Sequence, residues 1–228
     1  DRFTLTSAFS YLDGYYNNTA LDWYRAQDPR PDYYRRLPSY VENTEIASQI
    51  AEALSSDENL RQINWDRLYE VNRNSLETIE NAGGTGQSIT GLRSHYVIEN
   101  RVIREQTASW NSYFSQIFNN RWSLQGGAGY QSGKTRNYKE LDDLLGGDFY
   151  VDVDQFAERD FPDNADALQN DLNRPNRILK VGDRYGYDYE NLVNKANAWL
   201  QSRFSSRHLD GFLSGQVSST RYQRNGFV

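Results

Sequence analysis

The distribution of proline constrains this chain most, because proline cannot donate to a β-ladder and is excluded from central strands. All five prolines fall within two stretches, residues 29–38 and 162–175. Elsewhere, apolar and polar residues alternate with a period of two, which predicts strands with one apolar face. The strands are expected near Phe3–Tyr11 and over residues 96–118, 122–131, 190–205 and 208–224. An all-β, antiparallel fold is therefore predicted.

Two of the links between these strands are short. Residues 119–121 form a plausible three-residue turn, since asparagine tolerates the left-handed conformation that a tight turn needs. A two-residue turn is predicted at residues 206–207. Both registers gather apolar residues on one face and polar residues on the other. The predicted neighbours are Phe118 with Trp122, Phe204 with Leu209, and Leu200 with Leu213.

The other two links are very long, about 22–92 and 139–188. Unstructured connections of that length are improbable in a compact domain, so they should hold structure of their own. Apolar spacing at Ile46, Ile50 and Leu54, and again at Leu68 and Asn72, predicts short helices in the first link. Alternating short and long links, with aromatic residues near the tight turns, is typical of a large outer-membrane β-barrel with long extracellular loops. A soluble β-sandwich alternates in the same way and stays an alternative.

The composition excludes several classes of protein. A formal charge of -6 and a pI near 5.0 argue against a nucleic-acid partner. A mean hydropathy of -0.86 leaves no all-apolar helical span. The absence of cysteine removes disulfides, thiol nucleophiles and Cys-ligated metals. A 14% aromatic content within only 37% hydrophobic residues suits strands whose two faces meet different surroundings.

The catalytic motifs in the chain are weak, and no enzyme is expected. Ala128–Thr135 satisfies a permissive phosphate-loop pattern in which Lys134 would contact phosphates and Thr135 magnesium. The residues before it alternate where a buried parallel strand should be continuously apolar, so a nucleotide hydrolase is a remote alternative. Carboxylates beside aromatics, such as Asp22 and Asp188, leave a glycosidase as a further alternative. Neither a Gly-x-Ser-x-Gly elbow nor a His-Glu-x-x-His helix is present.

An acidic stretch covers residues 139–171. It holds eleven acidic and two basic residues, a local net charge of -9. Oxygen-rich loops bind calcium, and Asp152 and Asp154 are the candidate ligands. The EF-hand spacing is missing, so a solvated acidic loop without metal is the favoured interpretation, and no other cofactor is expected.

Four phrases in the long links resemble a known family. They are Leu21–Tyr40, Gln62–Arg73, Leu144–Asp160 and Lys180–Tyr189. They are similar to extracellular loops of large TonB-dependent receptors, in the branch related to SusC-type importers that carry a carboxypeptidase-like regulatory domain. The resemblance covers most of both links. It implies a barrel of about twenty-two strands in the outer membrane of a Gram-negative bacterium, a periplasmic plug, and uptake powered through TonB.

The resemblance also implies which part of such a receptor this chain forms. No plug and no TonB box are recognised, and about five strands cannot close a barrel, so residues 1–228 are expected to be part of one barrel domain. The chain starts with Asp1 and not methionine, which also suits a processed product or an internal piece. The TonB complex would then be reached through other parts of the protein.

The expected function is active import of a nutrient ligand, a glycan, peptide or chelate, with this chain forming barrel wall and outer loops. The expected partners are outer-membrane lipid and a surface lipoprotein of the SusD-like kind. Flat rings stack on sugars at little entropic cost, so loop aromatics are the candidate ligand or partner contacts. These are Trp23, Tyr24, Tyr33, Tyr34 and Tyr150. For each ring the alternative is packing of the loops, and for the chain it is a soluble surface adhesin or glycan-binding sandwich.

Overall fold

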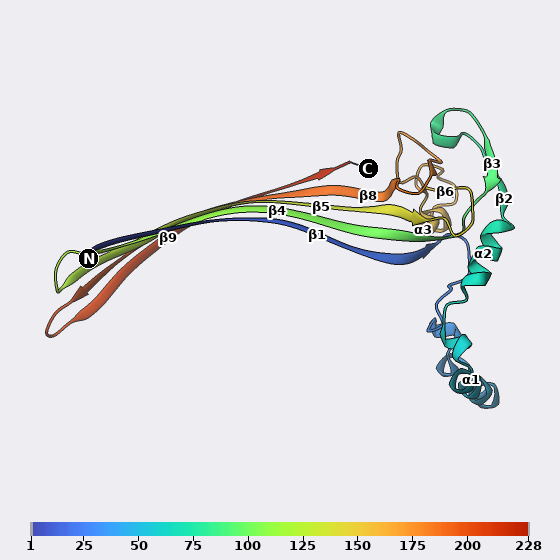
Figure 1. Ribbon diagram of the computed structural model, residues 1–228, viewed down its shortest axis with the longest axis horizontal. Coiled ribbons are helices and arrows are strands. Elements are labelled where there is room, and N and C mark those ends of the chain that lie inside the picture. Colours follow the sequence, from blue (N-terminus) through green and yellow to red (C-terminus); the bar gives the residue numbers. More distant parts are fainter. Residues whose placement is uncertain (1, 228) are drawn as a thin grey trace. The chain divides into compact units, whose positions relative to one another are not determined.

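A computed structural model describes residues 2–227, and five long strands dominate it. They form one antiparallel sheet in the order β1-β4-β5-β8-β9 (Figure 1). Their bounds are Phe3–Trp23 for β1, Tyr96–Ile117 for β4, Trp122–Asp143 for β5, Arg184–Ser205 for β8 and Asp210–Gly226 for β9. The all-β, antiparallel prediction is confirmed.

The shorter elements all lie in the two long links. The strand pairs are β2 (Leu76–Ile79) with β3 (Ile89–Leu92), and β6 (Tyr150–Val151) with β7 (Ile178–Leu179). The helices are α1 (Thr44–Ser56), α2 (Trp65–Arg73), α3 (Gln155–Asp160) and the 3-10 turns η1 (Tyr34–Arg36), η2 (Pro38–Tyr40), η3 (Glu58–Arg61) and η4 (Ala82–Gly84). The short helices predicted in the first link are confirmed by α1 and α2. Each begins at an asparagine whose side chain accepts from backbone N–H groups of the first turn, Asn43 for α1 and Asn64 for α2.

The described chain divides into two compact units. The sheet unit comprises residues 2–17, 102–138 and 187–227, and the loop unit comprises 18–101 and 139–186. Each long strand except β9 therefore contributes to both units, because its polar end continues into the loop unit.

The hairpin between β4 and β5 has the predicted contacts. Phe118 N–H donates to the Trp122 carbonyl at 3.0 Å, and the two rings stack with centroids 4.5 Å apart. Asn119 Oδ1 accepts from the N–H groups of Arg121 and Trp122, which holds the turn closed. The turn chemistry of asparagine was therefore sufficient to place this register.

The hairpin between β8 and β9 differs from the predicted register. Phe204 pairs with Gly211 and Leu200 with Gly215, a slip of two residues from the predicted partners Leu209 and Leu213. The turn is longer than two residues because Ser206 N–H donates to the Leu209 carbonyl, closing a four-residue loop. A register shift of two residues keeps every side chain on its predicted face of the sheet. The alternation of apolar and polar residues therefore could not distinguish the two registers.

The strands are also longer than predicted. β5 continues from residue 131 to Asp143 and β8 begins at Arg184, so the second link is shorter than the expected 139–188. Ala128–Thr135 consequently lies inside β5, whereas a phosphate loop must open a helix. Lys134 forms an ion pair with Glu190 at 2.5 Å. The structure gives the nucleotide-hydrolase alternative no support.

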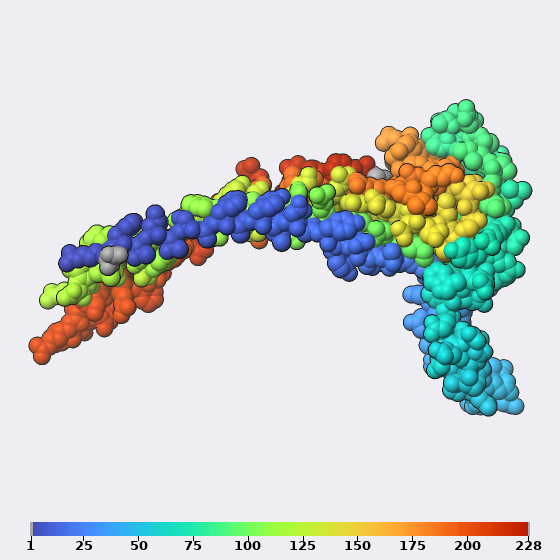
Figure 2. All heavy atoms as spheres, viewed as in Figure 1, coloured from blue at the N-terminus to red at the C-terminus, as the bar shows by residue number. Residues whose placement is uncertain are grey.

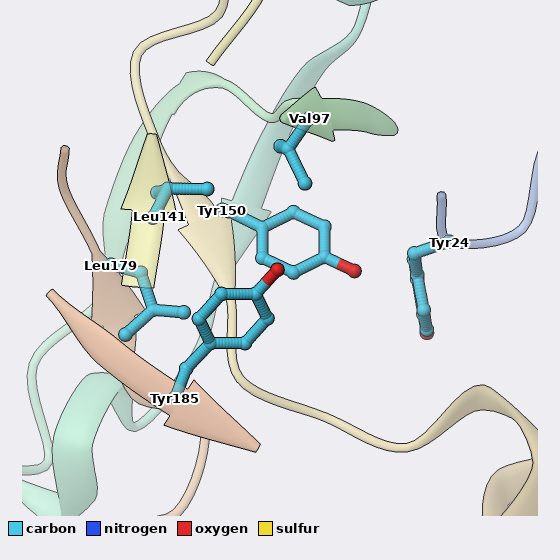
Figure 3. Packing of buried hydrophobic residues seen from close by; sticks show 6 residues of the cluster. All are labelled: Tyr24, Val97, Leu141, Tyr150, Leu179 and Tyr185. Atoms are coloured by element: carbon cyan, nitrogen blue, oxygen red, sulfur yellow. The ribbon is translucent and has the colours of Figure 1, made fainter. Parts of the chain in front are cut away.

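The buried hydrophobic clusters lie in the loop unit. One brings together the residue that follows β1 and residues from β4, β5, β6, β7 and β8: Tyr24, Val97, Leu141, Tyr150, Leu179 and Tyr185 (Figure 3). In Figure 3 the rings of Tyr150 and Tyr185 lie close together, and their centroids are 5.7 Å apart. A second cluster joins α2 to the start of β4 through Leu68, Tyr96 and Leu145. The two long links therefore fold on each other, and each holds structure of its own, as its length predicted.

Candidate functional site

One face of the sheet unit carries an apolar band. In each strand or its turn end the band spans nine residues: Phe3–Tyr11, Trp110–Phe118, Trp122–Tyr130, Ala196–Phe204 and Gly211–Ser219. At about 3.3 Å per residue each stretch is ~26 Å long. Every second residue lies on this face, and none of these positions is charged. We call this surface the apolar band.

The apolar band is exposed. The exposed fractions of Trp122, Leu200 and Leu213 are 44%, 49% and 79%. Figure 2 shows the atoms of β1 uncovered on the face that it draws. A β-sandwich would bury such residues against a second sheet, and residues 2–227 supply no such layer over them.

Aromatic residues mark both edges of the apolar band. Phe3, Phe118, Trp122 and Phe204 lie at the edge next to the tight turns, and Tyr11, Trp110 and Tyr130 lie at the other. Two pairs of polar groups within it are hydrogen-bonded: Trp122 Nε1 donates to Ser202 Oγ at 2.8 Å, and Ser7 Oγ bonds Ser112 Oγ at 2.8 Å. Such pairing suits a surface that cannot rely on water.

Ion pairs occur on the same face just beyond the aromatic edge formed by Tyr11, Trp110 and Tyr130. Lys134 pairs with Glu190 at 2.5 Å, and Arg136 binds both carboxylate oxygens of Asp188 at 2.9 and 2.8 Å. Both pairs bridge β5 to β8. The face therefore changes from apolar to ionic within a few residues of Tyr130.

The opposite face of the sheet unit is polar. It carries serine, threonine, asparagine and glutamine at most of the alternate positions. Its main aromatic contact is Tyr113 with Trp199, whose centroids are 6.0 Å apart. Trp199 lies against Gly127, where an added Cβ would come within 2.6 Å of the indole Nε1. The glycine thus allows a large ring to lie against the strand.

The loop unit contains an ionic cluster of Asp22, Glu99, Lys139 and Tyr185, with Arg101 at its edge; Glu99 and Tyr185 are buried, and Asp22 and Lys139 are half-buried. Lys139 Nζ donates to Glu99 Oε2 at 2.9 Å and to Asp22 Oδ2 at 3.2 Å. The single hydroxyl proton of Tyr185 is shared between the same two carboxylates, at 3.3 Å from Asp22 and 3.2 Å from Glu99, and the Lys139 ammonium lies 4.2 Å from the centroid of its ring. Arg101 Nε donates to the other oxygen of Glu99 at 2.5 Å. The cluster joins β1, β4, β5 and β8.

Lys139 is shared by two carboxylates whose pKa values shift in opposite directions. Burial raises the pKa of Asp22, and the nearby charge of Glu99 adds to this while Lys139 opposes it. Burial also acts on Glu99, but Lys139 and Arg101 outweigh it and lower the pKa of that carboxyl. For Lys139 burial opposes the charged form, yet the two carboxylates raise its pKa. The cluster therefore keeps Lys139 and Glu99 ionised, with Asp22 the easier carboxylate to protonate.

Gly186 makes room for this cluster. Its φ of +68° belongs to the left-handed region, and a Cβ there would lie 2.5 Å from Cε of Lys139. We expect Gly186→Ala to lower the free energy of unfolding by about 1–3 kcal/mol, through strain and displacement of the lysine. Denaturant titration measures the change. Gly182→Ala is the matched control, since Gly182 has φ +91° with nothing within 4 Å; equal losses in both variants would contradict a role for the lysine contact.

Asn72 joins the two links and was not predicted to be important. Its Nδ2 donates to the carbonyls of Tyr96, Leu144 and Leu145 at 2.8, 3.0 and 3.2 Å, and its Oδ1 accepts from the N–H of His95 at 2.8 Å. The residue is fully buried. The sequence periodicity predicted that Asn72 lies on the inner side of a helix. Periodicity alone does not tell whether such a residue makes apolar contacts or hydrogen bonds.

The five candidate contact aromatics do not form one surface. Tyr24 and Tyr150 are buried, 3% and 4% exposed, in the cluster of Figure 3. Trp23 is half-buried beneath the Arg30 guanidinium, 5.3 Å from its ring. Tyr33 and Tyr34 pack edge-to-face at 4.9 Å, with Tyr34 exposed. In the described structure Tyr24 and Tyr150 pack the loops together, and ligand or partner contact at these five aromatics stays a prediction.

The two candidate calcium ligands have protein partners. Asp152 is buried, with its Oδ2 2.6 Å from Arg177 Nη2 and its Oδ1 accepting from Asn170 Nδ2 at 2.8 Å. Asp154 Oδ1 accepts from the first-turn N–H groups of α3. Within residues 2–227 no three His, Asp or Glu side chains are grouped as a metal site would require. Calcium at Asp152 and Asp154 stays a prediction.

Much of the acidic stretch is neutralised by arginines. Besides the exposed pair of Asp160 with its neighbour Arg159, four of its carboxylates pair with guanidinium groups from inside and outside the second link. The pairs are Glu140 with Arg184, Asp152 with Arg177, Glu158 with Arg25, and Asp171 with Arg174. The stretch is therefore partly an ion-paired structural element, which a count of charges along the sequence does not reveal.

Comparisons with known proteins leave the chain without an assigned family. Within residues 2–227, no helix has the length and apolar character needed to cross a membrane. No protein-family model matches the chain, and no curated protein or solved structure matches it. The function must therefore be argued from the geometry described above.

Proposed function

We propose that this chain forms part of the wall and outer loops of an outer-membrane β-barrel that imports a nutrient ligand in a TonB-dependent manner. The observation that supports this is the apolar band: five adjacent strands with ~26 Å of uncharged, exposed surface, against an apolar height of about 25 Å for barrel walls. Its aromatic edges correspond to the two interfaces of a bilayer. The polar opposite face then lines the interior.

The apolar band is difficult to explain in water. Soluble monomers rarely expose contiguous apolar patches of more than a few hundred Å². Here the exposed apolar side chains continue across all five strands, and no layer of residues 2–227 covers them. Acyl chains are the solvent that makes such a surface favourable.

Five strands do not close a barrel, so the proposed wall requires further strands beside β1 and β9. We place the tight turns on the periplasmic side and the loop unit outside, where it meets the ligand or a surface lipoprotein. Energy reaches the importer through a TonB complex that contacts other parts of the protein. Import then consists of binding and conformational change, with no covalent chemistry in this chain.

Tryptophan quenching by brominated lipids tests the proposal. Trp122 belongs to the apolar band and Trp199 to the polar face. Two variants of the protein that carries this chain, each retaining one of these tryptophans, are placed in vesicles whose acyl chains are brominated near the headgroups. We expect strong quenching of Trp122 and weak quenching of Trp199. Equal quenching, or a protein that stays monomeric in buffer and ignores the vesicles, would support a soluble adhesin instead.

A further inference from the structure

A hollow of about 390 Å³ in the loop unit carries a further site. It lies between the segment after β1, η1, α2 and the start of β4, so it is formed within residues 18–101. This volume lies within the range of about 300–1,000 Å³ that small-molecule sites occupy. Its lining is Arg25, Ala26, Gln27, Pro29, Arg36, Asn64, Arg67, Leu68, Val71, His95 and Tyr96.

The charged residues of this lining are all arginines. Arg25, Arg36 and Arg67 contribute three guanidinium groups, and no aspartate or glutamate belongs to the lining. The chain as a whole carries -6, so a lining whose charged residues are all arginines differs from the chain's average, although Glu158 and Glu70 pair with Arg25 and Arg67 from outside the lining. The charges of Arg36 and Arg67 both act on the Tyr96 phenol and favour its ionised form, although burial, the largest effect, raises the pKa of Tyr96 overall.

The three guanidinium groups have donors to spare. Arg25 uses Nε and Nη2 for Glu158, and Arg67 uses Nη1 for Glu70, so each offers further N–H groups from its five. Arg36 donates to the backbone carbonyls of Asp28 and Arg30, while the nearby carboxylate of Asp28, which also interacts electrostatically with Arg36, is hydrogen-bonded by Arg30. The planar fork of arginine matches carboxylate and phosphate oxygens bidentately.

The rest of the lining suits the body of a small ligand. Leu68 and Tyr96 are buried and belong to the same apolar cluster, so they form a fixed floor. The Tyr96 hydroxyl donates to the Gln27 carbonyl at 2.7 Å, which holds the ring in place. Apolar walls with a few convergent polar groups are the usual composition of a small-molecule site.

We propose that this hollow binds a small organic anion, with its carboxylate or phosphate group held by Arg36, Arg67 and Arg25 and its body against Tyr96 and Leu68. The site belongs to the loop unit and does not depend on what covers the apolar band. It places an anion site at residues that neither the motifs nor the aromatic residues of the chain had indicated.

Calorimetric titration of the whole protein in detergent solution tests the site with three sugars of similar size. Glucuronate offers a carboxylate, glucose 6-phosphate a phosphate, and glucose neither. We expect one or both anions to bind with a Kd of about 1 mM or tighter, and glucose not to bind. The anion that binds more tightly shows whether the site prefers a carboxylate or a phosphate. Added salt should weaken its binding. Comparable binding of glucose, or no binding of either anion, would overturn the proposal.

Variants localise the binding. Arg67→Gln keeps the fold, because Arg67 makes an exposed ion pair within α2, and it should weaken the anion about tenfold or more. Arg36→Ala should do the same, and Arg36→Lys, which keeps the charge but loses the fork, should weaken it less. Arg35→Ala is the control, since Arg35 adjoins Arg36 but does not line the hollow. An unchanged affinity in Arg67→Gln and Arg36→Ala, or an equal loss in Arg35→Ala, would reject the site.

Discussion

Leu200→Arg should destabilise the protein in lipid vesicles by about 2–4 kcal/mol, the cost of a charge at the midplane of a barrel wall. Leu200 is the central residue of the Ala196–Phe204 stretch of the apolar band, and its side chain is 49% exposed. In water, replacing an exposed leucine by arginine changes the free energy of unfolding little. The size of the loss therefore shows whether water or lipid surrounds this side chain. Denaturant titration of the refolded protein gives the free energy of unfolding.

Gln201→Arg is the matched control for this substitution. Gln201 is the next residue of β8 and lies on the polar face, opposite Ser214 of β9. We expect a small change there, because a polar barrel interior hydrates a guanidinium. Equal effects at the two positions, or a near-neutral Leu200→Arg, would contradict the lipid-facing orientation.

Lys139→Met should lower the free energy of unfolding by about 3–5 kcal/mol, because it leaves a buried and a half-buried carboxylate without their shared cation. Glu99 is 1% exposed, and Lys139 supplies a hydrogen bond to it and to Asp22. Arg101 continues to neutralise one oxygen of Glu99, so we expect the loop unit to loosen but not to unfold at every pH. Denaturant titration measures the loss, and hydrogen exchange locates it.

The dependence of this loss on pH separates charge from packing. With the lysine gone, protonation of Asp22 and Glu99 removes the uncompensated charge, so the difference from the parent protein should shrink as pH falls through their pKa values. Adding Asp22→Asn and Glu99→Gln to Lys139→Met should recover part of the stability at neutral pH. Arg159→Met, which removes an exposed ion pair with Asp160, should have no measurable effect. A loss that is independent of pH would indicate that only the packing of the lysine stem matters.

The prediction from sequence was most accurate where a local rule dominates. The alternation from Trp122 to Tyr130 placed the apolar face correctly, and Asn119 placed the first hairpin turn. The second hairpin was placed two residues off, because serine and arginine at residues 206–207 carry no specific turn geometry and a slip of two preserves the faces. The ends of β5 and β8 were placed short because their polar residues resemble those of a loop.

The candidate site was predicted less well, for a physical reason. The sequence by itself determined the periodic features: strands with one apolar and one polar face, an uncharged stretch of similar length in each, and two long links with short helices. Only the tertiary structure decided which distant residues meet, such as Lys139 with Asp22 and Glu99, or Arg36 with Arg67 around one hollow. Alternation is a local property of neighbouring residues. A buried charge or a cavity is formed by segments that lie tens of residues apart in the sequence, and the periodicity of the sequence does not predict which of these segments come into contact.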